Sequence, residues 1–92
     1  MAWQNAWPAL VAVDGMAVIG FLRAITDGAV SLYLAELLVA PAWRRRGVAT
    51  LLLEVCHWLY PTTRIDLLAT ASSQAYYQAN GFRPFAGFRK SF

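Results

Sequence analysis

The sequence contains few cysteines, few acidic residues and no long uninterrupted hydrophobic run. Its single cysteine, Cys56, cannot form an intramolecular disulfide, which excludes a disulfide framework and favours a reducing compartment. Charged residues interrupt every apolar run before the ~18 residues that a transmembrane helix needs. No basic side chain precedes Arg23, so a secretory leader is not expected. We therefore predict a cytoplasmic protein with no membrane partner.

The residues that could bind a metal are equally scarce. The only histidine, His57, follows Cys56 directly, and adjacent residues of a helix point about 100° apart. The two side chains therefore form neither a nucleophile–base pair nor a zinc site. We expect no metal, and we expect both residues to be ordinary parts of a helix.

What the chain does contain is a large share of apolar residues. Its 92 residues are 59% hydrophobic and 14% charged, whereas soluble domains average about 45–50% and about 25%. This length predicts one domain over residues 1–92, near the lower limit for an adequate core. The apolar excess predicts either a homodimer or a ligand groove that is apolar when empty.

The order of apolar segments and turns predicts an α/β chain of the α+β kind with a mixed sheet. Three strands come first, because Asp-Gly pairs separate three apolar segments and short turns join antiparallel neighbours. A helix, a strand, a helix and a final strand follow. The expected strands cover residues 7–13, 16–25, 29–39, 65–69 and 82–92, and the expected helices cover 45–60 and about 72–80.

The sequence predicts which side of the first helix faces the sheet and where the second helix begins and ends. The apolar residues of the first one that recur at helical spacing should face the sheet. They are Val48, Leu51, Leu52, Val55 and Leu59. The second helix should begin at a cap on Ser72 or Ser73 and end at Gly81.

The most informative segment joins the third strand to the first helix. Pro41 ends the strand, three arginines follow at 44–46, and Gly47 precedes the apolar helix. The unpaired N–H groups and the dipole of a helix N-terminus attract anions, so this turn can bind phosphate. Three cations at that position are disfavoured without an anion, which favours phosphate binding over a merely basic helix start. Nucleic acid would also satisfy the charge.

Two short motifs in the second half of the chain are typical of a known family. The segment Arg44–Ala49 reads R-R-R-G-V-A, and the segment Ala75–Phe82 reads A-Y-Y-Q-A-N-G-F. The first fits the pattern Q/R-x-x-G-x-G/A and the second ends in Y-[EQ]-x-x-G-F, so the chain resembles the GNAT superfamily of acetyl-CoA-dependent N-acetyltransferases. The resemblance covers roughly the second half of the chain. Members of that family usually begin with another strand and two helices, whereas this sequence starts at about the family's second strand.

The resemblance implies an acetyl-CoA site on the basic turn and the preceding strand. Backbone N–H groups over 46–49 would hold the pyrophosphate, with Arg44 and Arg45 adding charge. The end of the strand would pair with the pantetheine amides and offer a backbone N–H to the developing oxyanion. The implied donor-binding residues are Leu38, Val39, Ala40, Arg44, Arg45, Arg46, Gly47, Val48, Ala49 and Thr50.

Two residues are candidates for proton transfer. Tyr77 stands four residues before Gly81, where the resemblance implies the acid that protonates the departing thiolate. A phenol with a pKa near ~10 suits a thiol with a pKa near ~8.5; a ring packed on the sheet is the alternative. Glu36 is the only acid within an apolar strand, where a carboxylate is costly unless it is paired or faces a cleft. It is either the base or amine-binding group, or the ion-pair partner of Arg23.

The predicted function is acetyl transfer from acetyl-CoA to a primary amine, on a small molecule or a peptide, by direct attack in a ternary complex. One alternative is a degenerate coenzyme A-binding or dimerisation module, which the missing first elements favour. A small nucleic-acid-binding domain is less favoured, because its cations would spread over one face instead of clustering in a turn.

Overall fold

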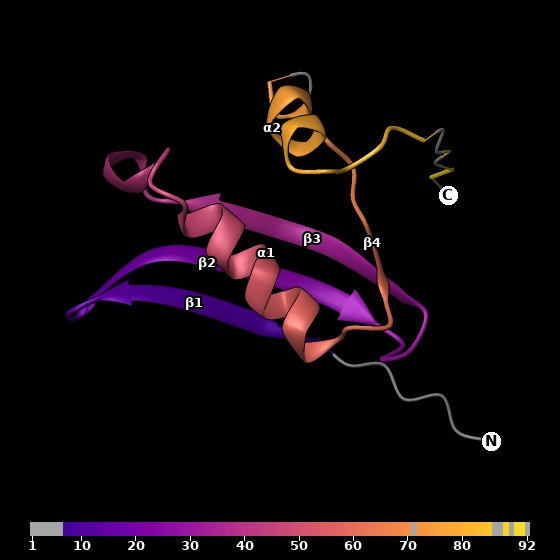
Figure 1. The fold of residues 1–92 in the computed structure, drawn as a ribbon, viewed down its shortest axis with the longest axis horizontal. Coiled ribbons are helices and arrows are strands. Elements are labelled where there is room, and N and C mark those ends of the chain that lie inside the picture. The colour runs from indigo at the N-terminus through magenta and orange to yellow at the C-terminus, as the bar shows by residue number, and fades with distance from the viewer. Residues whose placement is uncertain (1–6, 71, 86–87, 89, 92) are drawn as a thin grey trace.

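The computed structural model of the chain describes residues 7–70, 72–85, 88 and 90–91. Within them, four strands form one sheet in the order β1-β2-β3-β4. The helix α1 lies across one face of the sheet, and α2 lies beyond the edge of the sheet where β3 and β4 stand (Figure 1). The elements are β1 (Ala9–Asp14), β2 (Ala17–Thr26), β3 (Ser31–Val39), the 3-10 helix η1 (Pro41–Trp43), α1 (Val48–Leu59), β4 (Arg64–Asp66) and α2 (Gln74–Ala79).

The sheet is mixed, as the sequence predicts. The strands β1, β2 and β3 are antiparallel, and β4 is parallel to β3 after the crossover through α1. The turn between β2 and β3 is held by Asp27, whose carboxylate accepts three backbone N–H bonds from residues 29–31. These bonds lower the pKa of Asp27.

The first helix starts later than predicted. It begins at Val48 instead of Arg45, because Arg45 (φ 64°) and Gly47 (φ 82°) both have left-handed backbone conformations that a right-handed helix cannot include. The second helix begins after Ser73, but the hydroxyl of Ser73 bonds Thr70 instead of an N–H group of α2. The turn before α1 is therefore longer than the sequence pattern indicates, whereas α2 begins at the predicted N-cap residue Ser73 without a side-chain capping bond.

The predicted final strand is wrong for the part of it that the structure describes. Residues 82–85, 88 and 90–91 contain no strand, and residues 86–87, 89 and 92 lie outside the described chain. Two features explain the difference. Pro84 cannot donate to a ladder, and β4 ends at Asp66 instead of the predicted Ala69, so it offers only a short edge for pairing.

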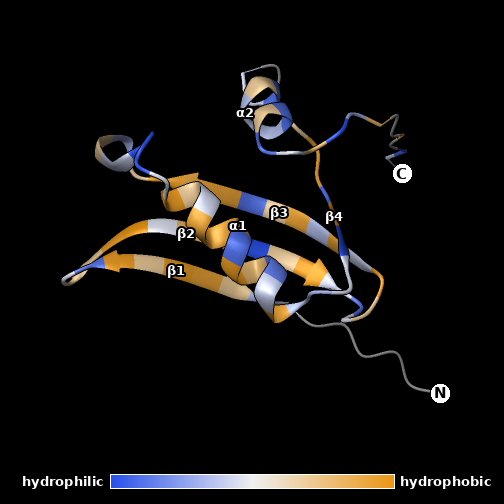
Figure 2. Cartoon of the chain, in the orientation of Figure 1, coloured by the Kyte–Doolittle hydropathy of each residue, from blue (hydrophilic) through white to orange (hydrophobic). Residues whose placement is uncertain are grey.

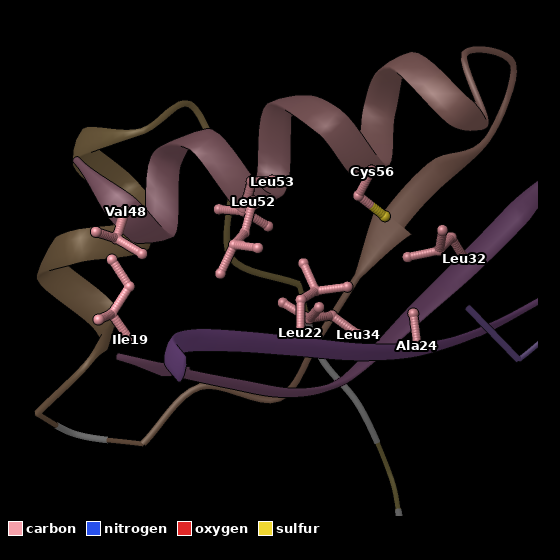
Figure 3. Packing of buried hydrophobic residues seen from close by; sticks show 9 residues of the cluster. All are labelled: Ile19, Leu22, Ala24, Leu32, Leu34, Val48, Leu52, Leu53 and Cys56. Atoms are coloured by element: carbon pink, nitrogen blue, oxygen red, sulfur yellow. The ribbon is translucent and has the colours of Figure 1, made fainter. Parts of the chain in front are cut away.

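The core lies between α1 and one face of the sheet (Figure 3). Leu22 and Leu32 from the sheet and Cys56 from the helix are the largest fully buried side chains. The buried residues of α1 are Val48, Leu52, Leu53 and Cys56. The predicted stripe is therefore rotated: Leu51, Val55 and Leu59 are exposed instead of facing the sheet. A nearly continuous apolar helix does not mark its inner face by periodicity alone.

A bulge in β3 decides which side chains reach the core. Ala24 pairs with Leu34 and Arg23 pairs with Glu36, so Ala35 is an extra residue in the ladder. Before the bulge the even-numbered residues of β3 face α1, and after it the odd-numbered residues do. Glu36 consequently lies on the face opposite α1, where its charge does not enter the core.

Gly20 allows α1 to lie close to β2. A Cβ atom at residue 20 would lie 2.7 Å from Cγ1 of Val48 and 3.2 Å from Cδ1 of Leu52. We expect Gly20→Ala to lower the free energy of unfolding by about 1–3 kcal/mol, because a packed interface resists added volume. Urea unfolding measures this loss.

A compensating variant provides the control for Gly20→Ala. In a Val48→Ala background the nearest clashing atom is gone, so the added methyl group at residue 20 should cost clearly less. An equal cost in both backgrounds would contradict the close contact between β2 and α1.

Candidate functional site

The strands β3 and β4 separate part of the way along β3. They pair only at Ser31–Arg64, Leu32–Ile65 and Tyr33–Asp66. The chain of β3 continues to Val39, while β4 turns away toward α2 (Figure 1). No described strand pairs with this edge of β3 beyond Tyr33, so backbone groups along it are available to a ligand.

A groove of about 490 Å³ lies between β3 and the segment that follows β4. It brings together four residues that the sequence predicts to be functional: Glu36, Leu38, Arg44 and Tyr77. These residues come from β3, from the turn before α1 and from α2. The separation of the strands therefore joins parts of the chain that are far apart in sequence.

The turn after β3 is fixed by its arginines. The Nε–H of Arg44 donates to the carbonyl oxygen of Val39 at 3.2 Å, and the guanidinium of Arg46 lies 4.9 Å from the ring centroid of Trp43. Arg45 adopts the left-handed conformation and is exposed. The backbone N–H of Ala40 donates to Ile19 O at 2.8 Å, so this predicted donor-binding residue uses its N–H within the sheet.

The N-terminus of α1 is open. Its N-cap is Gly47, which makes no side-chain cap, and the first N–H bond into the helix runs from Leu51 to Gly47 O. In the described chain, the N–H groups of residues 48–50 donate to no backbone carbonyl outside the helix. No atom lies within 4 Å of a Cβ built on Gly47. A phosphate group therefore fits against this turn.

The predicted motif at the end of α2 forms a helix-terminating structure. Gly81 has φ 88°, its N–H donates to Gln78 O, and the N–H of Phe82 donates to Tyr77 O. This pattern is a Schellman motif, and its usual apolar contact is present because the rings of Tyr77 and Phe82 meet edge to face at 5.4 Å. The spacing from tyrosine to glycine and phenylalanine therefore orients the Tyr77 ring.

Tyr77 is half-buried at the boundary between two grooves. It lines the groove beside β3 and also a larger one, of about 1010 Å³, which is formed by β4, α2 and residues 81–85. Burial, and to a smaller degree the neighbouring Tyr76, raises the pKa of Tyr77 above its ordinary value near 10. The phenol is consequently protonated throughout the neutral range.

The structure shows the ion pair that is one of the two alternatives for Glu36, whereas its role as base or amine-binding group stays a prediction. Glu36 lines the groove, and it also forms an ion pair with Arg23, its cross-strand neighbour in β2. Both side chains are partly exposed, so the pair contributes little to stability. The ion pair places the Arg23 guanidinium beside the carboxylate of Glu36, which lines the groove.

The segment between β4 and α2 is the part of the groove wall that sequence reasoning missed. Leu67, Leu68, Thr70, Ser72 and Ser73 all line the groove. The available signal was a cluster of Thr and Ser after a buried strand, which marks a polar connection where binding residues often lie.

In the described residues, no group of three or more His, Cys, Asp or Glu side chains is placed to hold a metal ion. None of the helices described has the length and apolar character needed to cross a membrane. Cys56 is buried in the core, and burial raises the pKa of its thiol.

Comparison with solved structures finds several acetyltransferases. A GNAT-family acetyltransferase of Streptococcus pneumoniae TIGR4 has a TM-score of 0.80 at 24% identity, and the match covers 91% of this chain and 70% of that one. An aminoglycoside acetyltransferase from an uncultured soil metagenomic sample gives 0.77 at 26% identity, over 92% and 64% of the two chains. The aminoglycoside N-acetyltransferase AAC(6')-Iy, solved with CoA, gives 0.73 at 24% identity, over 94% and 77%.

These comparisons support the predicted fold class. No curated protein matches the sequence. The family model of the acetyltransferase (GNAT) domain matches residues 5–84, which is most of the chain. Together with the separated β3 and β4 strands, the open N-terminus of α1 and the Tyr-to-Gly-Phe end of α2, this match establishes that the chain belongs to the GNAT acetyltransferase family.

Proposed function

We propose that this chain is an N-acetyltransferase that transfers an acetyl group from acetyl-CoA to a primary amine by direct attack in a ternary complex. The observation that carries the proposal is the groove beside β3, which gathers Glu36, Leu38, Arg44 and Tyr77 next to the open end of α1. The groove is about 490 Å³, which is within the usual range for small-molecule sites.

The donor site consists of the turn and the unpaired edge of β3. Backbone N–H groups over 46–50 and the side chains of Arg44 and Arg45 would bind the phosphates, since α1 presents its positive end there. The end of β3 at Leu38 and Val39 would pair with the pantetheine amides, whereas Ala40 would only border this edge because its N–H and carbonyl are bonded to Ile19 and Trp43. When bound, acetyl-CoA supplies an activated thioester whose carbonyl an amine can attack.

Proton transfer is assigned to two groups of the chain. Tyr77 would donate its phenolic proton to the departing thiolate, because its raised pKa keeps that proton in place at neutral pH. Glu36 would orient the acceptor ammonium and accept its proton directly or through a water molecule. Arg23 would fix the Glu36 carboxylate by their ion pair.

We also propose a cytoplasmic homodimer that takes a small-molecule or peptide amine and binds neither nucleic acid nor membrane. The support is a set of exposed apolar side chains on the sheet face opposite α1. They belong to β1, β2 and β3, whose ribbons are mostly coloured as hydrophobic in Figure 2. The members of this set are Val11, Val13, Val18, Tyr33 and Leu38. Sedimentation velocity at micromolar concentration checks the dimer; a monomer there would contradict it.

Thermal unfolding with acetyl-CoA tests the proposed function, with ATP as the phosphate control. At a ligand concentration 100 times the Kd, selective binding to the native state adds about 2.7 kcal/mol, which raises Tm by roughly 11–22 °C for a domain of this size. Release of free thiol with a panel of amines then measures transfer.

The outcomes separate the alternatives. A rise in Tm with acetyl-CoA but not with ATP, together with amine-dependent thiol release, is the expected result. A rise without release from any amine supports the degenerate coenzyme A-binding module. No rise with acetyl-CoA, alongside salt-sensitive binding of nucleic acid, would support a nucleic-acid-binding domain instead.

A further inference from the structure

The two adjacent tyrosines of α2 have different surroundings. Tyr77 lines the groove, whereas the hydroxyl of Tyr76 lies 3.2 Å from Oγ1 of Thr50 in α1. Their rings meet edge to face at 5.3 Å and 75°. Because neighbouring residues of a helix point about 100° apart, fixing the direction of one ring also fixes the direction of the other.

The helix α2 depends on outside contacts for its position. It has six residues, and a helix that short is not stable alone in water. Irregular chain precedes it over residues 67–70 and 72–73. Its attachments to the rest of the molecule include the packing of Tyr76, Tyr77 and Phe82 against the core cluster and the hydrogen bond to Thr50. Among these, the hydrogen bond is the directional one.

Thr50 belongs to the open first turn of α1. It is the third residue of that helix, so its N–H is one of the groups that have no intrahelical acceptor. Its side chain meanwhile contacts Tyr76. One residue therefore takes part in the proposed donor-binding turn through its backbone and in the attachment of α2 through its side chain.

We propose that Tyr76 is a positioning residue, whose hydrogen bond to Thr50 attaches α2 to the donor-binding turn and so sets the Tyr77 phenol against the groove. This inference rests on the proposed function, because it assigns Tyr76 to the same reaction. It predicts that the bond matters for the chemical step more than for donor binding, since the backbone groups that would hold the phosphates do not depend on it.

The test compares Tyr76→Phe with the wild-type protein. Removing one hydroxyl leaves the ring contact with Tyr77 intact but loosens α2. We expect kcat to fall about 10-fold, because small misplacements of a reacting group slow catalysis, while KM for acetyl-CoA changes by less than about twofold. Tyr60→Phe removes a hydroxyl from a residue that lines neither groove and should leave kcat unchanged.

Changes at Thr50 distinguish positioning from a loss of packing. Thr50→Val removes the hydroxyl and should reproduce the effect of Tyr76→Phe, and the double variant should be no slower than either single one. Thr50→Ser restores a hydroxyl and should restore most of kcat. Additive losses, or a kcat for Tyr76→Phe within twofold of wild type, would overturn the inference and leave the proposed function standing.

Amide hydrogen exchange tests the attachment of α2 to the donor-binding turn without requiring acetyl transfer. If no amine is acetylated, the proposed transferase fails, but the attachment of α2 can still be measured with acetyl-CoA alone. Binding at the turn should slow exchange in α2 of the wild-type protein and not in Tyr76→Phe. Equal protection of α2 in both proteins would overturn the coupling through Thr50.

Discussion

Replacing Tyr77 with phenylalanine is expected to lower kcat for acetyl transfer by about 10²-fold, because a general acid contributes at least that much. The ring contacts with Tyr76 and Phe82 do not involve the hydroxyl, so the fold should be preserved. Steady-state rates of thiol release, with unfolding measured in parallel, check this. A kcat within twofold of the wild-type value would mean that Tyr77 is a packing residue only.

The pH dependence gives a second readout for the same variant. Burial raises the pKa of Tyr77, so the phenol of the wild-type protein should stay protonated at neutral pH. At alkaline pH, the wild-type kcat should fall only as the pH rises through that raised value, above about 10. The Tyr77→Phe variant should lack this alkaline decrease. Tyr60→Phe serves as the matched control, because Tyr60 lines neither groove and its variant should retain the decrease.

Replacing Gly47 with glutamate is expected to abolish stabilisation by acetyl-CoA. Gly47 is the N-cap of α1 and leaves open space where a ligand backbone or phosphate can approach. A carboxylate there fills this space and repels phosphate. The increase of about 2.7 kcal/mol expected for the wild-type protein at 100 times its Kd should disappear. Thermal unfolding with and without the ligand measures it.

Gly28→Glu is the matched control for this variant. Gly28 has φ 83°, nearly the same as the 82° of Gly47, and it also has no atom within 4 Å of a built Cβ. Both substitutions therefore place a strained glutamate in open space, but only one lies at the proposed donor site. Equal losses of stabilisation in the two variants would show that the effect is strain and not a blocked site.

Local signals of the sequence predicted much of this protein. The Asp-Gly turns gave the antiparallel strands, because a tight turn fixes its own backbone geometry over a few residues. The arginine and glycine turn gave the open helix N-terminus, and the Tyr-to-Gly-Phe spacing gave the end of α2. Each of these features is encoded within a few neighbouring residues.

Other features required contacts between distant residues, and sequence reasoning placed them wrongly or not at all. The inner face of α1 was misjudged because almost every residue from Val48 to Leu53 could face a core. The bulge at Ala35 depends on how β2 aligns with β3, and the short range of β4 depends on where it leaves β3. The hydrogen bond between Tyr76 and Thr50 was not foreseen for the same reason.

The sequence by itself thus determined the order of the elements from β1 to α2, the glycine-containing turn before α1 and the family of the chain, since these follow from local backbone preferences and short motifs. Only the tertiary structure decided that Glu36 faces away from the core beside Arg23 and that β3 and β4 separate beyond Tyr33. It also decided that Tyr77 lines the same groove as Glu36. The physical reason is that these arrangements arise from register and side-chain packing between segments tens of residues apart, which no local pattern specifies.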